Sequence, residues 1–178
     1  MFNKIFCVSD NDYRQIKMNI SNDKIYKIGN PRYDRILNNL ENVEYKLDPS
    51  IKNEGNILIF ASMWDEDNKI IFEKFINSPL VNRFEKVIIV PHEVNDYYLN
   101  YYCSVLEDND FSFKKINQYQ NFNQFEEEYI IINKVGFLSK LYAQSTIAYV
   151  GGGFSKSGIH NIIEPAAASN PVIFGSNF

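Results

Sequence analysis

The sequence has few cysteines, no excess of basic residues and no long apolar run, and each shortage argues against a class of protein. Its 2 cysteines, Cys7 and Cys103, form no C-x-x-C pair, so neither a disulfide framework nor a zinc site is indicated. A formal net charge of −4 leaves no broad basic surface for a nucleic-acid backbone. No apolar run approaches the roughly 20 residues of a membrane-spanning helix, and the first residues lack the apolar stretch of a signal peptide.

What the sequence does have is an ordinary globular composition and a series of short apolar runs. Hydrophobic residues make up 45% and charged residues 22% of its 178 residues, so we expect it to fold around one good core. The runs are continuous rather than alternating, which is typical of parallel strands that are covered on both faces. They are Ile5–Val8, Ile57–Phe60, Val87–Val90, Ile130–Ile132, Ile147–Val150 and Val172–Phe174.

Segments with the helical spacing of apolar residues lie between these runs, at about residues 70–76, 99–106 and 137–142. This alternation of strands and helices predicts βαβ units. The fold class that we expect is therefore α/β, with a Rossmann-like, doubly wound parallel sheet. In such sheets, ligands bind at the carboxyl ends of the strands.

A polar stretch at residues 38–56 separates the first run from the regular alternation. We expect residues 1–37, with one strand and one helix, to be the end of a preceding domain, because they have too few apolar residues to close a core. Residues 57–178, which contain the regular alternation, form the predicted second domain. Because the sequence stops soon after its last strand, we expect this domain to be incomplete and the chain to be a fragment.

Three consecutive glycines, Gly151–Gly153, directly follow the run Ile147–Val150. Glycine lets a ligand approach the backbone and makes positive φ angles easy to adopt. Asn161 is a good N-cap with Glu164 three residues later, so we predict a capping box and a helix that starts at Asn161. The start of such a helix suits a phosphate. Glu164 would alternatively turn outward and accept hydrogen bonds from a ribose diol.

Two common phosphate-binding patterns are absent from this stretch. The dinucleotide pattern G-x-G-x-x-G is interrupted by Lys156, and the P-loop pattern fails because Ile159 and His160 follow the last glycine. A glycine turn and a capping box with purely structural roles remain the alternative interpretation.

The blocks around this turn resemble the Kdo transferases, bacterial GT-B glycosyltransferases that transfer 3-deoxy-D-manno-octulosonic acid. The matching blocks are Val150-Gly151-Gly152, then His160-Asn161-Ile162-Ile163-Glu164-Pro165-Ala166-Ala167, and then Asn170 to Gly175. Three further blocks follow the family's order, namely Gly29 to Arg35 at the interdomain linker, Ala61 to Asp67 after the first strand of the C-terminal domain, and Val90 to Glu93 after the second.

The resemblance implies a C-terminal GT-B domain, truncated at both ends, that binds the donor CMP-Kdo. The parent enzyme would transfer Kdo to a lipid A precursor, lipid IVA, in lipopolysaccharide biosynthesis. The implied CMP contacts are Pro91, His92, Val135, Gly136, Phe137, Gly152, Gly153, His160, Asn161, Ile162, Ile163 and Glu164, with Ser62 and Trp64 as further donor-site candidates. Arg32 matches the linker's basic position and would stabilise the leaving phosphate. Where many members have Gly-Glu, this chain has Gly136-Phe137, so backbone contact is expected there.

The resemblance also places the general base, a glutamate, and the acceptor's lipid contacts in an N-terminal domain that this chain does not contain. The parent is thus expected to be a peripheral enzyme on the cytoplasmic side of the inner membrane, and the chain alone to be inactive. We expect no cofactor and no metal, because Asp65, Glu66 and Asp67 fit the start of a helix by their charge. From the residues alone, a UDP-sugar donor and a non-catalytic nucleotide-binding module stay open.

Overall fold

The computed structural model describes residues 2–44, 56–156 and 158–178. These residues belong to two compact units, Met1–Glu41 and Asn42–Phe178. In the first unit, two short strands pair in parallel, and Ser9 caps the first helix by accepting a hydrogen bond from the backbone N–H of Asp12 at 3.1 Å. Its elements are β1 (Ile5–Cys7), α1 (Asp10–Lys17), a 3₁₀ turn (Asn22–Lys24), β2 (Ile25–Lys27) and α2 (Pro31–Glu41).

This first unit therefore has two strands and two helices where the sequence predicted one of each. Strand β2 was missed because two of its three residues are exposed, so it forms no apolar run. Helix α2 continues to Glu41 and so enters the polar stretch predicted at 38–56. Residues 45–55 of that stretch lie outside the described residues.

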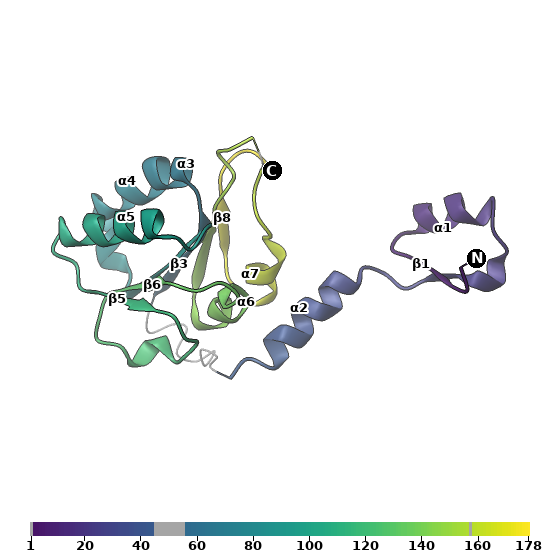
Figure 1. Cartoon of the computed structure of the whole chain (residues 1–178), viewed down its shortest axis with the longest axis horizontal. Coiled ribbons are helices and arrows are strands. Elements are labelled where there is room, and N and C mark those ends of the chain that lie inside the picture. Colours follow the sequence, from purple (N-terminus) through teal and green to yellow (C-terminus); the bar gives the residue numbers. More distant parts are fainter. Residues whose placement is uncertain (1, 45–55, 157) are drawn as a thin grey trace. The chain divides into compact units, whose positions relative to one another are not determined.

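A six-stranded, all-parallel sheet forms the centre of the second unit, in the spatial order β5-β6-β4-β3-β7-β8 (Figure 1). The predicted runs from Ile57 onward are all confirmed as strands of this sheet. Only the edge strand β5 was not predicted, because its Phe-Lys-Lys-Ile sequence has two exposed lysines in the middle. The strands are β3 (Ile57–Met63), β4 (Lys86–Pro91), β5 (Phe113–Ile116), β6 (Tyr129–Ile132), β7 (Ile147–Val150) and β8 (Val172–Phe174).

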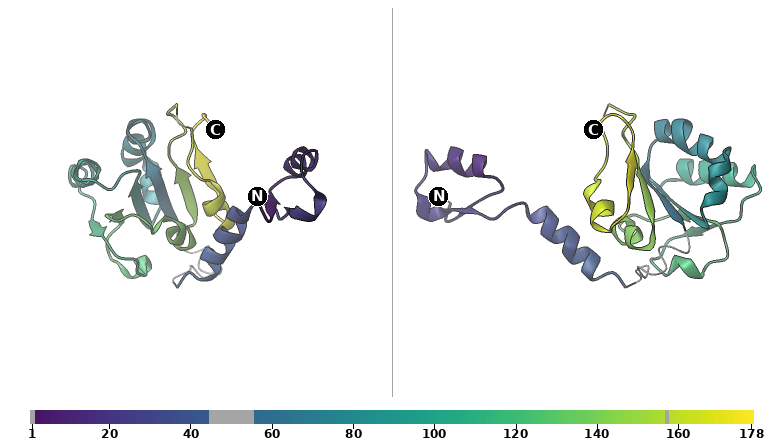
Figure 2. Two further views of the ribbon diagram at one scale, coloured as in Figure 1. Left: turned by 45° about the vertical axis from the view of Figure 1, so that its right-hand side comes forward. Right: turned by 180° about the vertical axis from the view of Figure 1, so that it is seen from behind.

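Helices cover both faces of this sheet (Figure 2). The helices that follow β3 and β4 pack on one face, whereas the short helices that follow β6 and β7 pack on the other. They are α3 (Asp65–Asp67), a π-helical turn (Asn68–Phe72), α4 (Glu73–Ile76), α5 (Asp96–Glu107), α6 (Leu138–Leu141) and α7 (Ile163–Ala167), with 3₁₀ turns at Pro79–Arg83, Phe122–Gln124 and Tyr142–Gln144. No helix of the described residues is long and apolar enough to cross a membrane.

Alternate residues of the strands point into two separate apolar clusters. On β3, Leu58 and Phe60 face the cluster under α4 and α5, whereas Ile57, Ile59 and Ala61 face the cluster under α6. Because both faces are buried, the strands read as continuous apolar runs. The predicted fold class, a Rossmann-like doubly wound parallel α/β sheet, is confirmed. In such a sheet the loops that follow the strands all lie at its carboxyl end.

Candidate functional site

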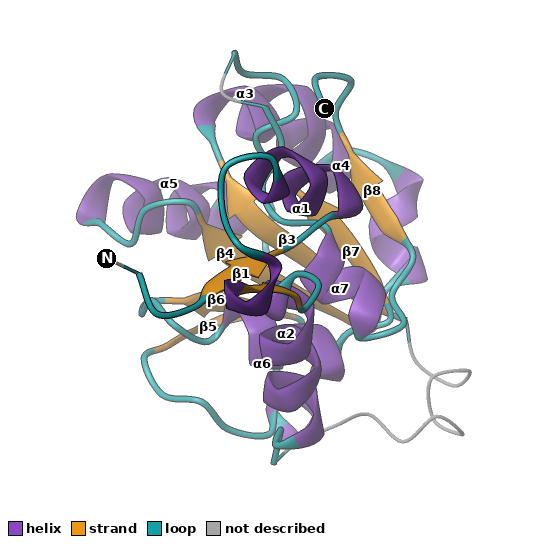
Figure 3. Cartoon of the chain, turned by 90° about the vertical axis from the view of Figure 1, so that its right-hand side faces the viewer, coloured by secondary structure: helices purple, strands orange, loops and turns teal. Residues whose placement is uncertain are grey.

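The direction of chain winding reverses at the centre of the sheet, between β3 and β7. From β3 the chain builds β4, β5 and β6 on one side, with β6 between β4 and β5, and it then returns to add β7 and β8 on the other (Figure 3). The loops that leave β3 and β7 diverge at this point, which is where doubly wound sheets bind ligands. Ser62 and Trp64 lie at the end of β3, His92 follows β4, and the glycines 151–153 follow β7.

The glycine loop packs tightly against the protein's own backbone. Gly152 has φ of +94°, and an added Cβ would lie 2.6 Å from the carbonyl oxygen of Gly158. A Cβ on Gly153 would lie 2.6 Å from the backbone nitrogen of Gly175. Neighbouring backbone thus occupies the positions that a Cβ would take, so the loop requires glycine at both residues. The predicted contact of Gly152 and Gly153 with the donor stays a prediction.

Asp67 joins the two diverging loops through a fully buried carboxylate. Its side chain is 0% exposed. Oδ2 accepts the backbone N–H of Gly152 at 2.8 Å and that of Trp64 at 3.0 Å, while Oδ1 accepts the hydroxyl of Tyr149 at 2.6 Å. Burial and the neighbouring Asp67 raise the pKa of Tyr149 far above its usual value of 10, so its hydroxyl stays a donor. Asp67 thus fixes the end of β3 to the start of the glycine loop.

Three aromatic rings from three different loops meet at the same place. The rings of Trp64 and His92 stack with centroids 3.7 Å apart and planes 19° apart. The indole Nε1–H of Trp64 donates to Nε2 of His160 at 2.7 Å, and the centroids of the two imidazole rings are 4.7 Å apart. The backbone N–H of His92 donates to the carbonyl of Met63 at 3.0 Å, which ties this loop to the end of β3. Three predicted site residues are thereby brought together.

His160 is held as a neutral imidazole in this cluster. Burial lowers its pKa below the usual 6.5 and the adjacent His92 lowers it further, whereas Asp67 acts weakly in the opposite direction. Because Nε2 accepts the hydrogen bond from Trp64, the single proton of the neutral ring lies on Nδ1. His160 therefore presents an N–H donor without carrying a positive charge.

The predicted capping box at Asn161 is wrong. Helix α7 begins at Ile163, and its N-cap residue is Ile162 rather than Asn161. The side-chain oxygen of Asn161 accepts the backbone N–H of Ile163 at 3.1 Å, and its amide nitrogen donates to Oε1 of Glu164 at 2.8 Å. Glu164 therefore bonds a side chain rather than the backbone N–H that a capping box requires. Pro165 is buried in the first turn, as its missing N–H allows.

The remaining predicted contacts are not part of the ring cluster. Val135 and Gly136 are exposed after β6, and Phe137 packs against Tyr119 in the apolar cluster beneath α6. Pro91 is the buried last residue of β4. Arg32 belongs to the first unit, at the start of α2, where its backbone N–H donates to the side chain of Asn30 at 3.0 Å. Its proposed electrostatic role remains a prediction.

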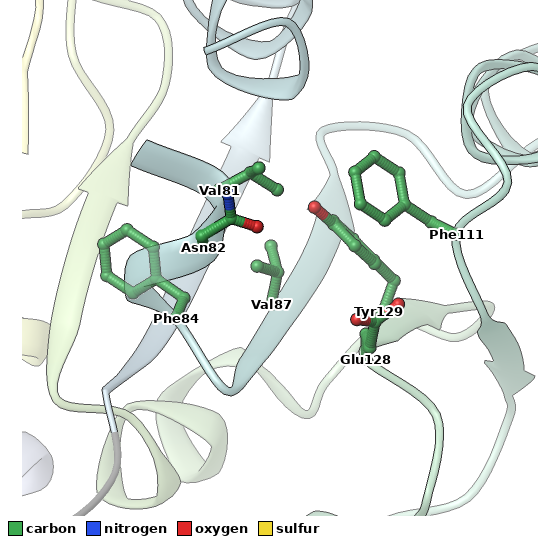
Figure 4. Close-up of a pocket in the computed structure, with 7 residues that line it drawn as sticks. All are labelled: Val81, Asn82, Phe84, Val87, Phe111, Glu128 and Tyr129. Atoms are coloured by element: carbon green, nitrogen blue, oxygen red, sulfur yellow. The ribbon is translucent and has the colours of Figure 1, made fainter. Parts of the chain in front are cut away.

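Two cavities of the second unit lie elsewhere and contain no predicted site residue. One, of about 570 Å³, is apolar and lies between α4 and the strands β3, β7 and β8. The other, of about 200 Å³, lies at the amino ends of β4 and β6, where Tyr129 points its hydroxyl into the space beside Phe111 (Figure 4). Neither cavity lies at the loops that leave β3, β4 and β7, where the predicted polar side chains meet. The carboxyl ends of these three strands therefore stay the better candidate site.

Asp67 was the residue that sequence reasoning missed. It was explained as one of three acids at the start of a helix, and it does stand there, in α3. The bonds to Tyr149 and Gly152 span 82 and 85 residues of sequence, so no local pattern signals them. Within the described residues, no group of three or more acidic, histidine or cysteine side chains is placed to hold a metal ion.

Comparison with known proteins gives a consistent set of relatives, although no protein-family model matches the chain. It is 28% identical over 168 residues to a bifunctional glycosyltransferase/methyltransferase of Fusobacterium nucleatum, covering 91% of this chain and 25% of that protein. It is 27% identical over 176 residues to the 3-deoxy-D-manno-octulosonic acid transferase of Chlamydia trachomatis serovar D, covering 96% and 39%. The transferase of the same name from Aquifex aeolicus is 30% identical over 127 residues, covering 70% and 33%.

A solved structure has the same fold. It is described as the C-terminal CMP-Kdo binding domain of WaaA from Acinetobacter baumannii, with a TM-score of 0.56 and 18% sequence identity, covering 83% of this chain and 72% of that one. The similarity supports the fold assignment independently of the sequence. The chain spans between a quarter and two fifths of the length of the curated relatives described above.

Proposed function

We propose that this chain, which is homologous to part of the bacterial Kdo transferases and has the fold of a C-terminal domain of that kind, binds the donor CMP-Kdo. The observation that carries the proposal is the convergence of Trp64, His92 and His160 at the point where the sheet reverses. Together with Asn161 and Glu164, they lie in the sequence blocks that carry the resemblance. The donor nucleotide binds beside this cluster.

The chemistry of these groups suits the phosphate and the ribose of a nucleoside monophosphate, and the cytosine base is proposed from the resemblance. The backbone N–H groups of Asn161 and Ile162 precede α7, and no backbone carbonyl of the described chain accepts from them. They and the Nδ1–H of His160 are donors for the phosphate oxygens. Glu164 accepts from the ribose hydroxyls with the carboxylate oxygen that Asn161 does not use. Neutral donors hold an anion here without requiring a basic surface.

In the parent enzyme, Kdo then passes from CMP to a hydroxyl of a lipid A precursor by an inverting displacement. The departing phosphate gains negative charge, which the N–H groups before α7 stabilise. The same role for Arg32 stays a prediction from the resemblance. A glutamate of the N-terminal half removes the proton of the acceptor hydroxyl. That half also binds the lipid, which places the enzyme peripherally at the cytoplasmic side of the inner membrane.

Titration of the full 178-residue chain with CMP, UMP and UDP, followed by calorimetry and by ¹⁵N NMR, tests the proposal. We expect CMP to bind more tightly than the uridine nucleotides and to shift the amide signals of Gly152, Asn161 and Ile162. Tighter binding of UDP than of CMP would indicate that the donor is a UDP-sugar. If millimolar CMP shifts no amide of a chain that circular dichroism shows to be folded, the proposal is wrong.

A further inference from the structure

Asp67 is a buried carboxylate with which no lysine or arginine of the described residues forms an ion pair. The two ion pairs of the described residues lie elsewhere, at Lys27–Asp10 and Lys114–Glu127. Removing a charge from water is costly unless hydrogen bonds replace its hydration. Three donors do so at Asp67, the hydroxyl of Tyr149 and the backbone N–H groups of Trp64 and Gly152. We therefore ask which segments this buried carboxylate connects through its three hydrogen bonds.

The three donors belong to segments that the fold itself separates. Trp64 lies on the loop leaving β3 toward α3, Tyr149 lies within β7, and Gly152 lies on the loop leaving β7. One oxygen, Oδ2, accepts from both loops. An added Cβ on Gly151 would lie 2.8 Å from this same Oδ2, so the loop closes directly over the carboxylate. Asp67 thereby sets the spacing of the two loops that leave β3 and β7.

The positioning continues from Trp64 to His160. With its backbone fixed by Asp67, Trp64 stacks on His92 and donates its indole N–H to Nε2 of His160. That bond selects the His160 tautomer with the proton on Nδ1. The orientation of a neutral, half-buried donor thus depends on a carboxylate that is itself fully buried.

We propose that Asp67 is a positioning residue for donor binding, which ties the glycine loop to Trp64 and, through Trp64, fixes the tautomer and orientation of His160. The proposal rests on the proposed function, since the ligand is the nucleotide phosphate of the donor. It adds a residue that touches no part of the ligand but on which the ligand's hydrogen-bond donors depend.

The test is Asp67→Asn in the full chain. An amide replaces one acceptor oxygen by an NH₂ group, which must then face an N–H or O–H donor. We expect the amide signals of Gly152 and Trp64 to shift and the ¹⁵N signals of His160 to change from the single Nδ1–H tautomer to a mixture. CMP affinity should fall about tenfold. The matched control, Glu66→Gln, changes an exposed acid of the same helix and should leave all three readouts unchanged.

Trp64→Phe keeps the test decisive if Asp67→Asn does not fold. It retains a ring against His92 but removes the N–H that donates to His160. We expect the tautomer mixture and a three- to tenfold loss of CMP affinity in this variant also. An unchanged His160 tautomer in a folded Asp67→Asn chain, or in Trp64→Phe where the first variant is unfolded, overturns the proposal.

The readouts separate this proposal from the proposed function. The tautomer and the amide shifts are measured without ligand, so they test the role of Asp67 even if the wild-type chain binds no CMP. A wild-type chain that fails to bind CMP but shows the single tautomer contradicts the proposed function alone. A wild-type chain that binds CMP, and whose Asp67→Asn variant binds it within twofold with an unchanged tautomer, contradicts the positioning role alone.

Discussion

The two ends of the parallel sheet use buried polar groups differently. At the amino end, Lys86 is 8% exposed and donates to the carbonyl oxygens of Phe125 and Glu127 at 2.6 and 3.0 Å. Burial lowers the pKa of this ammonium. The hydroxyl of Thr146 bonds both the N–H and the carbonyl of Ile57. These bonds link one part of the chain to another, so the amino end is closed by its own polar groups.

At the carboxyl end, the polar groups offer more bonding capacity than the fold uses. Asp67 is saturated by donors, but His160 and Glu164 are half-buried and bond the protein through one ring nitrogen and one carboxylate oxygen. The polar groups described at the amino end thus bond other parts of the protein, whereas His160 and Glu164 at the carboxyl end each keep an atom that the fold does not use. Substitutions at the amino end should change stability alone, and those at the carboxyl end should change nucleotide binding.

The largest effect is expected from Gly152→Ala. The new methyl group would meet the carbonyl of Gly158 at 2.6 Å in a backbone with φ of +94°, and such strain costs about 3 kcal/mol. We expect this loss of stability by urea unfolding and a loss of detectable CMP binding. Gly158→Ala is the matched control, because Gly158 also has a positive φ, +75°, but its Cβ would have room. It should cost only about 1 kcal/mol. Equal losses in both variants would show that crowding at Gly152 is unimportant.

Tyr149→Phe should have the next largest effect on stability. The hydroxyl donates to Oδ1 of Asp67 at 2.6 Å, and a buried carboxylate that loses a donor costs about 2 kcal/mol. Because the bonds from Oδ2 to Gly152 and Trp64 remain, CMP affinity should fall less than in Asp67→Asn. Unfolding in urea and calorimetry measure the two quantities. A variant as stable as the wild type would mean that Tyr149 does not help to hold the carboxylate.

Glu164→Ala should weaken CMP binding about tenfold, or about 1.4 kcal/mol, because the ribose loses an acceptor. Stability should change by less than about 1 kcal/mol, since the bond from Asn161 is only partly buried. Glu66→Ala removes the same charge from an exposed site and should bind CMP as the wild type does. If both variants lose affinity equally, the effect is one of net charge and Glu164 makes no contact.

A smaller effect is expected from pH. The pKa of His160 is lowered below 6.5 in the folded chain, so below pH 6.5 the unfolded chain binds a proton that the folded chain does not. Stability should therefore fall as the pH drops below 6.5 and level off beneath the folded pKa. The chain has 2 histidines, so NMR titration resolves His160 with His160→Gln as the assignment. A folded pKa at or above 6.5 would contradict the neutral imidazole.

The sequence predicted the buried part of the fold better than its edges. Central strands such as Ile57–Met63 and Ile147–Val150 are covered on both faces and so form apolar runs that are easy to recognise. The strands β2 and β5 were missed because exposed residues interrupt them. Pairing with a neighbouring strand, rather than their own composition, makes these segments extended.

The candidate site was predictable where it lies in a local motif and not where it depends on distant contacts. The blocks around His92 and His160 were found from sequence order, although their stacking with Trp64 was not foreseen. The start of α7 was misplaced by two residues: Asn161 accepts the N–H of Ile163 from outside the helix, and Glu164 bonds the Asn161 side chain instead of a backbone N–H. Asp67 was not found because in the sequence it looks like the neighbouring acids Asp65 and Glu66. Only its hydrogen bonds to Tyr149 and Gly152, which lie on distant segments, distinguish it.

The smallest effect is expected from Tyr129→Phe at the amino end. Its hydroxyl is buried beside the cavity of Figure 4 and has no hydrogen-bond partner among the described residues. Burial raises the pKa of Tyr129 far above the usual value of 10, so the hydroxyl is neutral. Removing an unpaired buried hydroxyl should leave stability unchanged or raise it by up to about 1 kcal/mol, with CMP affinity within twofold of the wild type.

The pair Tyr129→Phe and Tyr149→Phe makes the same chemical change at the two ends of the sheet. Both side chains are 2% exposed, so the apolar burial that each contributes is alike, and the variants differ in whether the hydroxyl has a carboxylate to bond. A loss of about 2 kcal/mol in Tyr129→Phe as well would mean that this hydroxyl gains a partner in solution. The two hydroxyls would then contribute alike, and the effect at Tyr149 would not be specific to its bond with the carboxylate of Asp67.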